Sequence, residues 1–282
     1  MQCSYPRVFN GFLCPCRECM ACRINKKRLW THRIILESYM HKENLFLTLT
    51  YAPEHLPKDG AVNPRTLQLF LKRLRELVKP TRFRYFAVGE YGDQSFRPHY
   101  HLAVFGLGSR HVKAIEKAWP YGFVGFGDIN TATASYVAGY CTKKMTSFND
   151  SRLGDKHPEF TRMSNRPGIG VKALDVLLQH MDADSMAGDV PRVLRHGDKF
   201  YPLGRLLREK LRKSLFSEEK INAIKQIQKE EMQIMRKSKL SFEEVFKATE
   251  GLKDYLFELR SSNPNQEIIL KKRMSFWKKR RL

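Results

Sequence analysis

The sequence predicts an α+β fold with an antiparallel sheet, because strand and helix patterns follow one another in the order β-α-β-β-α-β through its middle part. The clearest strand is LFLTLTY at 45–51, where leucines alternate with Phe46 and two threonines. The clearest helix covers 63–79, where apolar residues recur at helical spacing. The strands at 83–90 and 96–106 flank a polar turn and are expected to pair as a hairpin. This element order is that of the split βαβ, or ferredoxin-like, fold.

Capping residues and glycines place the other elements. Asn63 is expected to cap the first helix, Pro64 to begin it and Pro80 to end it. The later elements are a short helix over 109–119 capped by Ser109, a glycine-rich strand over 121–129, a helix after Asn130, and two serine-capped helices over 217–239 and 241–260. The sequence therefore predicts a mainly helical C-terminal extension after the sheet.

The alternation within the strands assigns their side chains to two faces. One face is expected to pack under the two helices of the split βαβ unit. This core is expected to contain Leu45, Leu47, Leu49, Leu67, Phe70, Leu71, Leu74, Leu77, Val78, Tyr100, Leu102 and Val104. His99 and His101 then share the other, open face with Thr48 and Thr50, so the histidines are expected to face a binding site.

The charge of the chain points to a polyanionic partner. Its 282 residues include 51 Lys and Arg against 29 Asp and Glu, which gives a formal net charge of +22. A positive field of this size raises the local concentration of nucleic acid, with an anionic membrane surface or ribosomal packing as the alternatives. No run of apolar residues is long enough to span a bilayer, and the first residues lack the layout of a signal peptide.

The histidine pair is a candidate metal site. Imidazole binds borderline divalent cations, and a carboxylate adds a harder ligand. Two histidines with one carboxylate leave coordination positions for substrate oxygens, so the bound cation can act as a Lewis acid on a phosphodiester. The alternative is a pair of histidines that only form hydrogen bonds at a sheet surface.

Glu90, in VGEYG at the end of the neighbouring strand, is the nearest candidate for the third ligand. Its alternation with Phe86 and Val88 directs it toward the core under the helices. We therefore expect that a bulge at Gly89 or Gly92 is needed to turn Glu90 toward the histidines.

A second group of candidate residues follows the glycine-rich strand. Tyr136, Tyr140, Lys143 and Lys144 are spaced so that they share one face of a helix. A phenol has a pKa of about 10 and attacks phosphorus poorly unless a nearby cation favours the phenolate. Two tyrosines on one face would allow two successive attacks, one to cut a strand and one to reseal it. An aromatic pair packed in the core is the alternative.

These motifs resemble a known family. RPHYHLAVFG resembles the His-hydrophobe-His motif of HUH endonucleases, and SYVAGYCTKK resembles their two-tyrosine motif followed by lysine. In their order and spacing, the motifs over about residues 1–170 resemble the replication initiators of gokushoviruses, which are small single-stranded-DNA phages. The stretches that carry this resemblance are LCPCRECMACRINKKRLW, FLTLTYAPEHLP, LQLFLKRLREL, VGEYGDQSFRPHYH and TRMSNRPGIG.

The resemblance implies an HUH-type nicking domain that starts rolling-circle replication. His99 and His101, with Glu90, would hold Mg²⁺ or Mn²⁺ at the scissile phosphate. Tyr136 or Tyr140 would attack it, form a 5′-phosphotyrosine link and free a 3′-OH for a polymerase. The other tyrosine would attack the regenerated junction, and transfer of the first end to the new 3′-OH would close a circle.

The N-terminal cysteines also resemble those of the family. Five of the six cysteines lie within the first 22 residues, which argues for a reducing compartment and a local metal or redox site. Cys3, Cys16, Cys19 and Cys22 match the family's cysteines, and their C-x₂-C spacing suits structural Zn²⁺, with reduced free thiols as the alternative. Cys14 is additional, so the sequence leaves open which four would bind.

Partners and segments complete the expectations. The partners implied are single-stranded DNA at a replication origin and host replication proteins such as a helicase and a polymerase, in the cytoplasm of a bacterial host and without a membrane. The candidate DNA-binding residues are Arg97, Arg162, Arg166, Lys26, Lys27 and Arg28, of which Arg162 and Arg166 belong to a Gly/Pro loop at 161–170. The expected segments are 1–44 with the cysteines and a basic helix, 45–187 with the nicking domain, and 188–282 with basic helices.

Two other functions compete with this one. A non-catalytic ferredoxin-like domain that binds DNA or RNA would carry stacking aromatics on its middle strands, where this sequence has imidazoles. A different metalloenzyme with two histidines and a carboxylate, such as a non-haem iron oxygenase, would not explain the Tyr/Lys helix or the positive charge.

Overall fold

A computed structural model describes residues 3–9, 12–92, 94–140, 151–181, 189–228 and 230. The chain forms two compact units, one of Met1–Ile24 with Ser217–Leu282 and one of Asn25–Phe216. The division into three functional segments stays a prediction.

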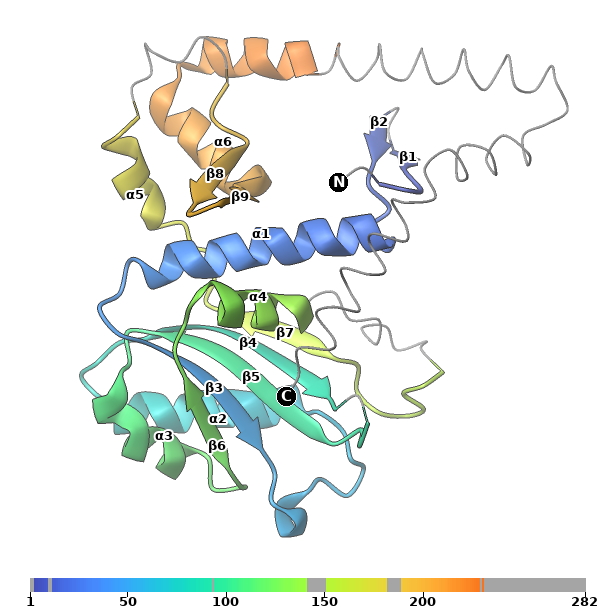
Figure 1. Ribbon diagram of the computed structural model, residues 1–282, viewed down its shortest axis with the longest axis vertical. Coiled ribbons are helices and arrows are strands. Elements are labelled where there is room, and N and C mark those ends of the chain that lie inside the picture. Colours follow the sequence, from blue (N-terminus) through green and yellow to red (C-terminus); the bar gives the residue numbers. More distant parts are fainter. Residues whose placement is uncertain are drawn as a thin grey trace, which may run out of the picture. The chain divides into compact units, whose positions relative to one another are not determined.

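The larger unit is built on a five-stranded antiparallel sheet with the strand order β6-β3-β5-β4-β7 (Figure 1). Its strands are β3 (Asn44–Thr50), β4 (Arg84–Tyr91), β5 (Pro98–Phe105), β6 (Val124–Gly127) and β7 (Phe160–Met163). The first four strands have the order of a ferredoxin-like sheet, and β4 and β5 form the predicted hairpin. This confirms the predicted α+β fold class.

The fifth strand corrects one expectation. Residues 161–170 were expected to form a loop throughout, but Thr161, Arg162 and Met163 belong to β7 and pair with β4. The strand pairing gives the backbone groups at the edge of β4 their partners, which a loop would not provide. Only the later part of the motif, from Ser164, leaves the sheet.

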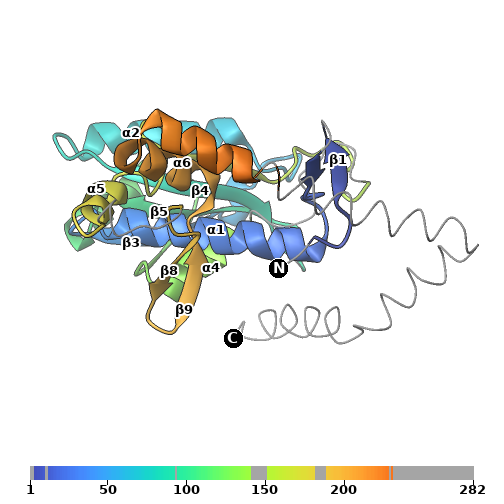
Figure 2. The same ribbon diagram turned by 90° about the horizontal axis from the view of Figure 1, so that it is seen from above.

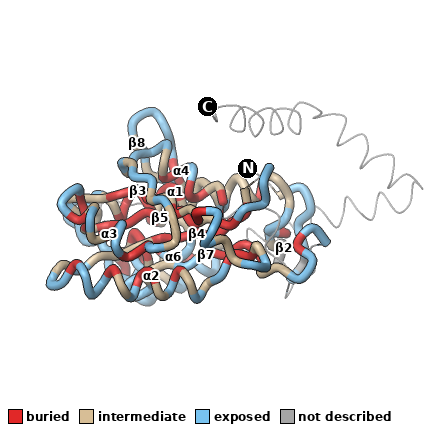
Figure 3. Tube along the Cα trace, turned by 90° about the horizontal axis from the view of Figure 1, so that it is seen from below, coloured by how far each residue is buried: buried red, intermediate tan, exposed pale blue. Residues whose placement is uncertain are grey.

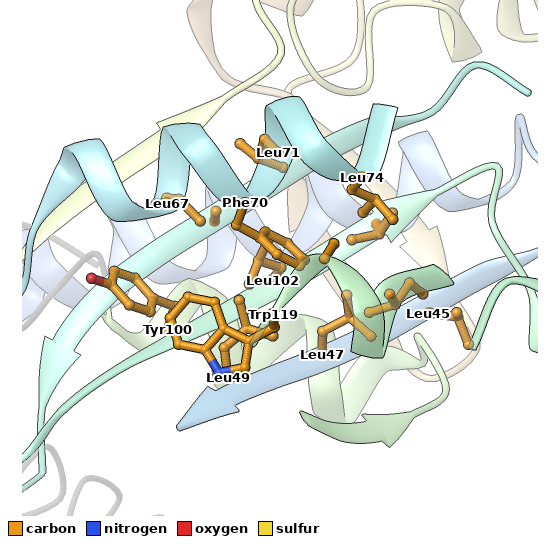
Figure 4. Packing of buried hydrophobic residues seen from close by; sticks show 14 of the residues in the cluster. Leu45, Leu47, Leu49, Leu67, Phe70, Leu71, Leu74, Tyr100, Leu102 and Trp119 are labelled. Carbon is orange, nitrogen blue, oxygen red and sulfur yellow. The ribbon is translucent and has the colours of Figure 1, made fainter. Parts of the chain in front are cut away.

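The first core lies under α2 (Pro64–Leu77) and α3 (Val112–Ala118), as predicted. Figure 4 shows leucines of β3 and α2 packed around Phe70, Tyr100 and Trp119. The Asn63 side chain caps α2 by accepting the Arg65 amide at 2.8 Å. Leu77 was expected in this core and is instead 39% exposed, because it lies on the outer side of the last turn. The second predicted helix begins as a 3₁₀ turn, η2 (Ser109–His111), so Ser109 lies inside the turn.

The opposite face of the sheet is also covered, which overturns the prediction of an open histidine face. Helix α1 (Met20–Ser38) contributes Ile34 and Ile35, and α4 (Thr131–Tyr140) packs on the same face (Figure 1). The side chains of this second core are Ile34, Ile35, Phe86, Val88, Ala103, Phe105, Ala134, Val137, Ala138, Tyr140, Ile169 and Tyr201. The apolar side chains of β4 and β5 alternate onto both faces, so both faces require helices.

The far side of α1 carries the last elements of this unit: α5 (Ala173–Leu178), the hairpin β8 (Val193–His196) and β9 (Lys199–Pro202), and α6 (Gly204–Leu215) (Figures 1 and 2). Arg28 donates to the Phe200 carbonyl at 2.6 Å, and His32 Nδ1 donates to the Pro202 carbonyl at 2.8 Å. These bonds fix the hairpin to α1. Buried residues are concentrated in the sheet strands and the helices against them (Figure 3).

The smaller unit contains the hairpin of β1 (Arg7–Phe9) and β2 (Phe12–Cys14). A short 3₁₀ turn, η1 (Pro53–His55), follows β3 in the larger unit. Residues 218–228 are helical, and the Ser217 hydroxyl accepts the Lys220 amide, as the serine cap predicts. The helix predicted over 241–260 lies outside the described residues. Among the helices of the described part, none has the length and apolar character needed to cross a membrane.

Candidate active site

The β4–β5 hairpin places Glu90 beside both histidines without a bulge. Glu90 is directly opposite His99 in the register, and Val88 is opposite His101. Directly paired residues of antiparallel strands point to the same face. Phe86 and Val88 do share a face with Glu90, as their alternation predicts, but this is the histidine face, because the second core lies there. The expected need for a bulge was therefore wrong.

The three side chains form a compact group of metal-binding atoms. Glu90 Oε1 lies 2.6 Å from His99 Nε2 and 3.0 Å from His101 Nε2. The ligand atoms of the three residues all lie within 4.8 Å of one another. Glu90 and His101 are buried, whereas His99 is half-buried. The group is thus reached from solvent on its His99 side.

The outer nitrogens of both rings are held by other groups. His99 Nδ1 lies 3.1 Å from the Arg97 carbonyl oxygen, which can only accept, so Nδ1 carries the proton. His99 Nε2 then directs a lone pair toward the Glu90 carboxylate, and this contact is favourable only with a proton or a cation shared between them. His101 Nδ1 lies 3.0 Å from Thr48 Oγ1. Such outer contacts orient imidazoles that bind metals, so the donor set fits a divalent cation.

The two tyrosines of α4 lie on the same face of the sheet as this group. The Tyr140 ring stacks on His101 with a centroid distance of 4.9 Å and an interplanar angle of 5°. The Tyr136 ring meets the His101 ring edge-on at 5.3 Å, and the two tyrosine rings are 4.9 Å apart. Tyr136 is 39% exposed, whereas Tyr140 is only 4% exposed. The helix therefore offers one accessible phenol and one buried phenol beside the histidines.

Lys27 supplies a cation near the tyrosines. A Cβ atom placed on Gly139, between the two tyrosines in α4, would lie 3.6 Å from Lys27 Nζ. Burial lowers the pKa of Lys27 below its usual value. The sequence assigned Lys27 to DNA binding and this role to Lys143 and Lys144, which lie outside the described residues.

The other predicted DNA-binding residues lie at several places. Arg97 is exposed and donates to the Tyr51 carbonyl at 2.9 Å. Arg162 is exposed on β7, where its guanidinium lies 5.5 Å from the centre of the Phe160 ring. Lys26 is exposed on α1, and Arg28 is held by the β8–β9 hairpin. These residues do not form one group.

Arg166 lines a cavity of about 570 Å³ in the larger unit. The same cavity is lined by Trp30, Arg33 and Lys210. The Arg33 guanidinium lies 4.4 Å from the centre of the Trp30 ring, and Arg33 Nε donates to the Ile169 carbonyl at 2.8 Å. Three cations and an indole ring in one cavity match the chemistry of a nucleotide, with an anionic phosphate and a flat base.

Several site residues escaped the sequence reasoning. Thr48 and Phe46 contact His101, and the alternation of LFLTLTY already placed both on the histidine face, so this signal was available. Trp30 and Arg33 had no such signal, because nothing in α1 indicated which of its sides meets residues 163–171.

Four of the five N-terminal cysteines gather in the smaller unit. The sulfur atoms of Cys3, Cys16, Cys19 and Cys22 lie within 4.8 Å of one another. Cys14, at the end of β2, is not part of this group. The structure therefore selects the four that the sequence left open.

Comparisons with known proteins match this architecture. Residues 44–145 match the model of a family described as replication-associated protein ORF2. The chain is 36% identical over 187 residues to replication-associated protein VP4 of Bdellovibrio phage phiMH2K, with 58% of each chain covered. It is 34% identical over 181 residues to replication-associated protein ORF2 of Spiroplasma virus 4, with 56% of each chain covered.

A third relative is replication-associated protein ORF4 of Chlamydia phage 1, which is 30% identical over 156 residues that cover 48% of this chain and 39% of the relative. The chain thus spans little more than half the length of the first two relatives. No solved structure matches. The family model and the relatives confirm the resemblance that the motifs predict, to the replication-associated proteins of microvirus-type single-stranded-DNA phages.

Proposed function

We propose that this protein nicks and rejoins single-stranded origin DNA in rolling-circle replication of a phage genome, in the cytoplasm of a bacterial host. The observation that carries the proposal is the contact between His101 and both tyrosine rings on one face of the sheet. A metal-binding group and two phenols are otherwise unrelated features of a fold. Their meeting at one histidine is what a metal-assisted tyrosine nucleophile requires.

His99, His101 and Glu90 are the residues that would hold the cation, and Mn²⁺ or Mg²⁺ fits their mixture of nitrogen and oxygen donors. When bound, the cation supplies Lewis acidity to a phosphate oxygen. The chain itself positions these ligands through the Arg97 carbonyl and Thr48. Lys27 adds positive charge beside α4, which favours the phenolate over the phenol.

Tyr136 is the nucleophile of the first cleavage, because its phenol is accessible and that of Tyr140 is buried. The Tyr136 oxygen forms a bond to phosphorus while the bond from phosphorus to the 3′-oxygen breaks. The phenol loses its proton, and the leaving 3′-oxygen gains one to become a 3′-OH. Tyr140 then performs the second attack, and the first tyrosine-bound 5′ end passes to the new 3′-OH. Each transfer exchanges one phosphodiester for another, so joining needs no nucleotide cofactor.

The same geometry weakens the non-catalytic alternative. A ferredoxin-like binding domain would use an uncovered sheet face for nucleic acid. Here α2 and α3 cover one face of the sheet, while α1 and α4 cover the other. The basic cavity at Trp30 and Arg166 is the better candidate for holding DNA beside the sheet.

The test is incubation of the full-length protein with circular single-stranded phage DNA and Mn²⁺, followed by denaturing electrophoresis. We expect a covalent protein–DNA adduct that disappears with a chelator. Tyr136→Phe should abolish the first adduct, whereas Tyr140→Phe should retain single-turnover cleavage and lose recircularised product. Tyr39→Phe, an exposed tyrosine of the α1 C-terminal end, is the matched control and should behave like the unmodified protein.

An adduct that persists in the double variant Tyr136→Phe/Tyr140→Phe would contradict the assignment of the nucleophiles. An adduct that is lost in Tyr140→Phe and kept in Tyr136→Phe would reverse their order.

A further inference from the structure

The four cysteines of the smaller unit have the separations of a tetrahedral metal site. Cys3 Sγ lies 3.8 Å from Cys19 Sγ, and Cys16 Sγ lies 3.9 Å from Cys22 Sγ. Zinc binds thiolate sulfur at about 2.3 Å, and a tetrahedron of that radius has edges of about 3.8 Å. A disulfide bond would require about 2.05 Å between sulfur atoms. These two cysteine pairs therefore match ligands around one ion rather than bonded pairs.

Two parts of the chain bring the sulfur atoms together. Cys16, Cys19 and Cys22 follow one another at intervals of three residues, and Cys22 lies in the first turn of α1. The β1–β2 hairpin turns the chain back, so that Cys3 meets the segment after β2. Cys14 is the hairpin position opposite Arg7 and lies outside the group.

Backbone amides point at the sulfur atoms. The Cys16 amide donates to Cys3 Sγ at 3.2 Å, and the Cys19 amide donates to Cys16 Sγ at 3.2 Å. An amide that donates to sulfur stabilises the thiolate, which is the form that binds a metal. Zinc with four thiolates carries a net charge of −2, and Arg17 and Arg23 adjoin the ligands in sequence.

The described residues before Ile24 also lack another source of stability. The two apolar core clusters begin at Ile34 and Leu45, and neither includes a described residue of this segment. Its buried residues are Cys16, Ala21 and Cys22. A short segment without an apolar core is commonly held by a disulfide or a metal.

We propose that Cys3, Cys16, Cys19 and Cys22 bind one Zn²⁺ as four thiolates, and that Cys14 is not a ligand. The thiol protons pass to solvent on binding, and no oxidant or reductant takes part. With all four positions filled by protein, no position is left for a substrate, so the site is structural. This inference does not depend on the nicking activity.

The test uses the full-length protein purified without chelator, with metal content measured by mass spectrometry and with Co²⁺ exchanged for the bound metal. The sulfur-to-cobalt charge-transfer band is the decisive readout, because the imidazoles and carboxylate of the β4–β5 site cannot produce it. We expect this band in the unmodified protein and in Cys14→Ser, and its loss in Cys16→Ser and Cys19→Ser. Loss of the band in Cys14→Ser to the same degree would overturn the ligand set.

A second measurement avoids variants that fail to fold. In the unmodified protein, an alkylating reagent should label Cys14 while sparing Cys3, Cys16, Cys19 and Cys22 until a chelator is added, as peptide mapping would show. Rapid labelling of all five in the zinc-supplemented protein would overturn the proposal. Disulfide-linked peptides from Cys3 or Cys16 in the freshly purified protein would overturn it as well.

Discussion

At the scale of single residues, the candidate active site depends on one carboxylate that contacts two imidazoles. Glu90 is buried, and its Oε1 atom contacts both histidines. A buried carboxylate is costly unless positive charge compensates it. The site therefore gains from a bound cation twice, through ligation and through neutralisation.

Glu90→Gln tests this carboxylate. Because the amide keeps the shape and loses the charge, we expect cleavage of origin DNA to fall by about a hundredfold or more, as several kcal/mol of metal-assisted stabilisation are lost. Titration of the reaction with Mn²⁺ should show a weaker apparent affinity. Glu54→Gln, at an exposed position in η1, should leave both quantities unchanged. Equal activity of Glu90→Gln and the unmodified protein would remove Glu90 from the site.

Thr48 is a positioning residue for His101. Thr48→Val removes the hydroxyl 3.0 Å from His101 Nδ1, so the ring loses the contact that fixes its orientation. Loss of such an outer contact costs about 10- to 100-fold in metal affinity, and excess Mn²⁺ should restore much of the cleavage rate. Thr50→Val in the same strand removes a bond to the Phe123 carbonyl and should leave the metal dependence unchanged. A uniform loss that metal does not restore would indicate a purely structural role.

At the scale of elements, a buried ion pair joins α1 to β4 and to the loop after β7. Glu37 pairs with Arg84 and accepts the Gly170 amide at 2.6 Å. Arg84 in turn donates to the Pro167 carbonyl at 2.6 Å. Arg84 and the other contacts of Glu37 lower the pKa of this carboxyl against the opposing effect of burial. The loop that contributes Arg166 to the basic cavity is thus held through Glu37.

We expect Glu37→Ala to lower the free energy of unfolding by about 3–5 kcal/mol, because it leaves the Arg84 charge buried without its partner. Chemical denaturation followed by circular dichroism measures this change. The control is Glu76→Ala, which breaks an exposed ion pair with Lys79 and should cost about 1 kcal/mol or less. Similar losses in the two variants would contradict a structural role for the buried pair.

The contact between α1 and the β8–β9 hairpin responds to pH. His32 Nε2 lies 2.8 Å from His196 Nε2, and burial lowers the pKa of His32 to about 4. Burial also lowers the pKa of His196. In the unfolded chain a histidine has a pKa of about 6.5, so between these values the unfolded state binds more protons than the folded one. Stability must therefore decrease as the pH falls from about 6.5 toward 4.

Thermal unfolding between pH 7.5 and 4.5 measures this effect. We expect the unmodified protein to lose stability steadily below about pH 6.5, and His32→Gln to show a shallower pH dependence. His55→Gln, at an exposed position in η1, should keep the full dependence. An unchanged slope in His32→Gln would assign the effect to other groups.

At the scale of the whole molecule, the net charge of +22 sets how the protein meets DNA. Phosphate contacts release counterions, so binding weakens linearly on a log–log plot against salt, by about 0.7 per neutralised phosphate of a single strand. Arg166→Ala and Lys210→Ala should each reduce this slope by about that amount, if each contacts one phosphate in the basic cavity. Lys117→Ala, on α3 and exposed, is the control.

Binding of a short single-stranded oligonucleotide at several salt concentrations measures the slope. A slope that Arg166→Ala and Lys117→Ala lower equally would show that the whole surface, rather than the cavity, meets the phosphates.

The sequence by itself determined the strands, the helix α2 and the positions of the metal ligands within the β4–β5 hairpin. Periodicity, caps and turns are local, and paired strands convert that local pattern into a shared face. For this reason the histidines and the tyrosine helix could be named before any contact was known.

Only the tertiary structure decided what covers the histidine face. Strand alternation says which side chains share a face, but not which helix packs there, because that choice depends on contacts between segments far apart in the chain. The packing of α1 and α4 explained why Glu90 needs no bulge, placed Lys27 beside the tyrosines and distinguished the exposed Tyr136 from the buried Tyr140. The same long-range folding selected four of the five N-terminal cysteines, because spacing alone does not fix where Cys3 returns.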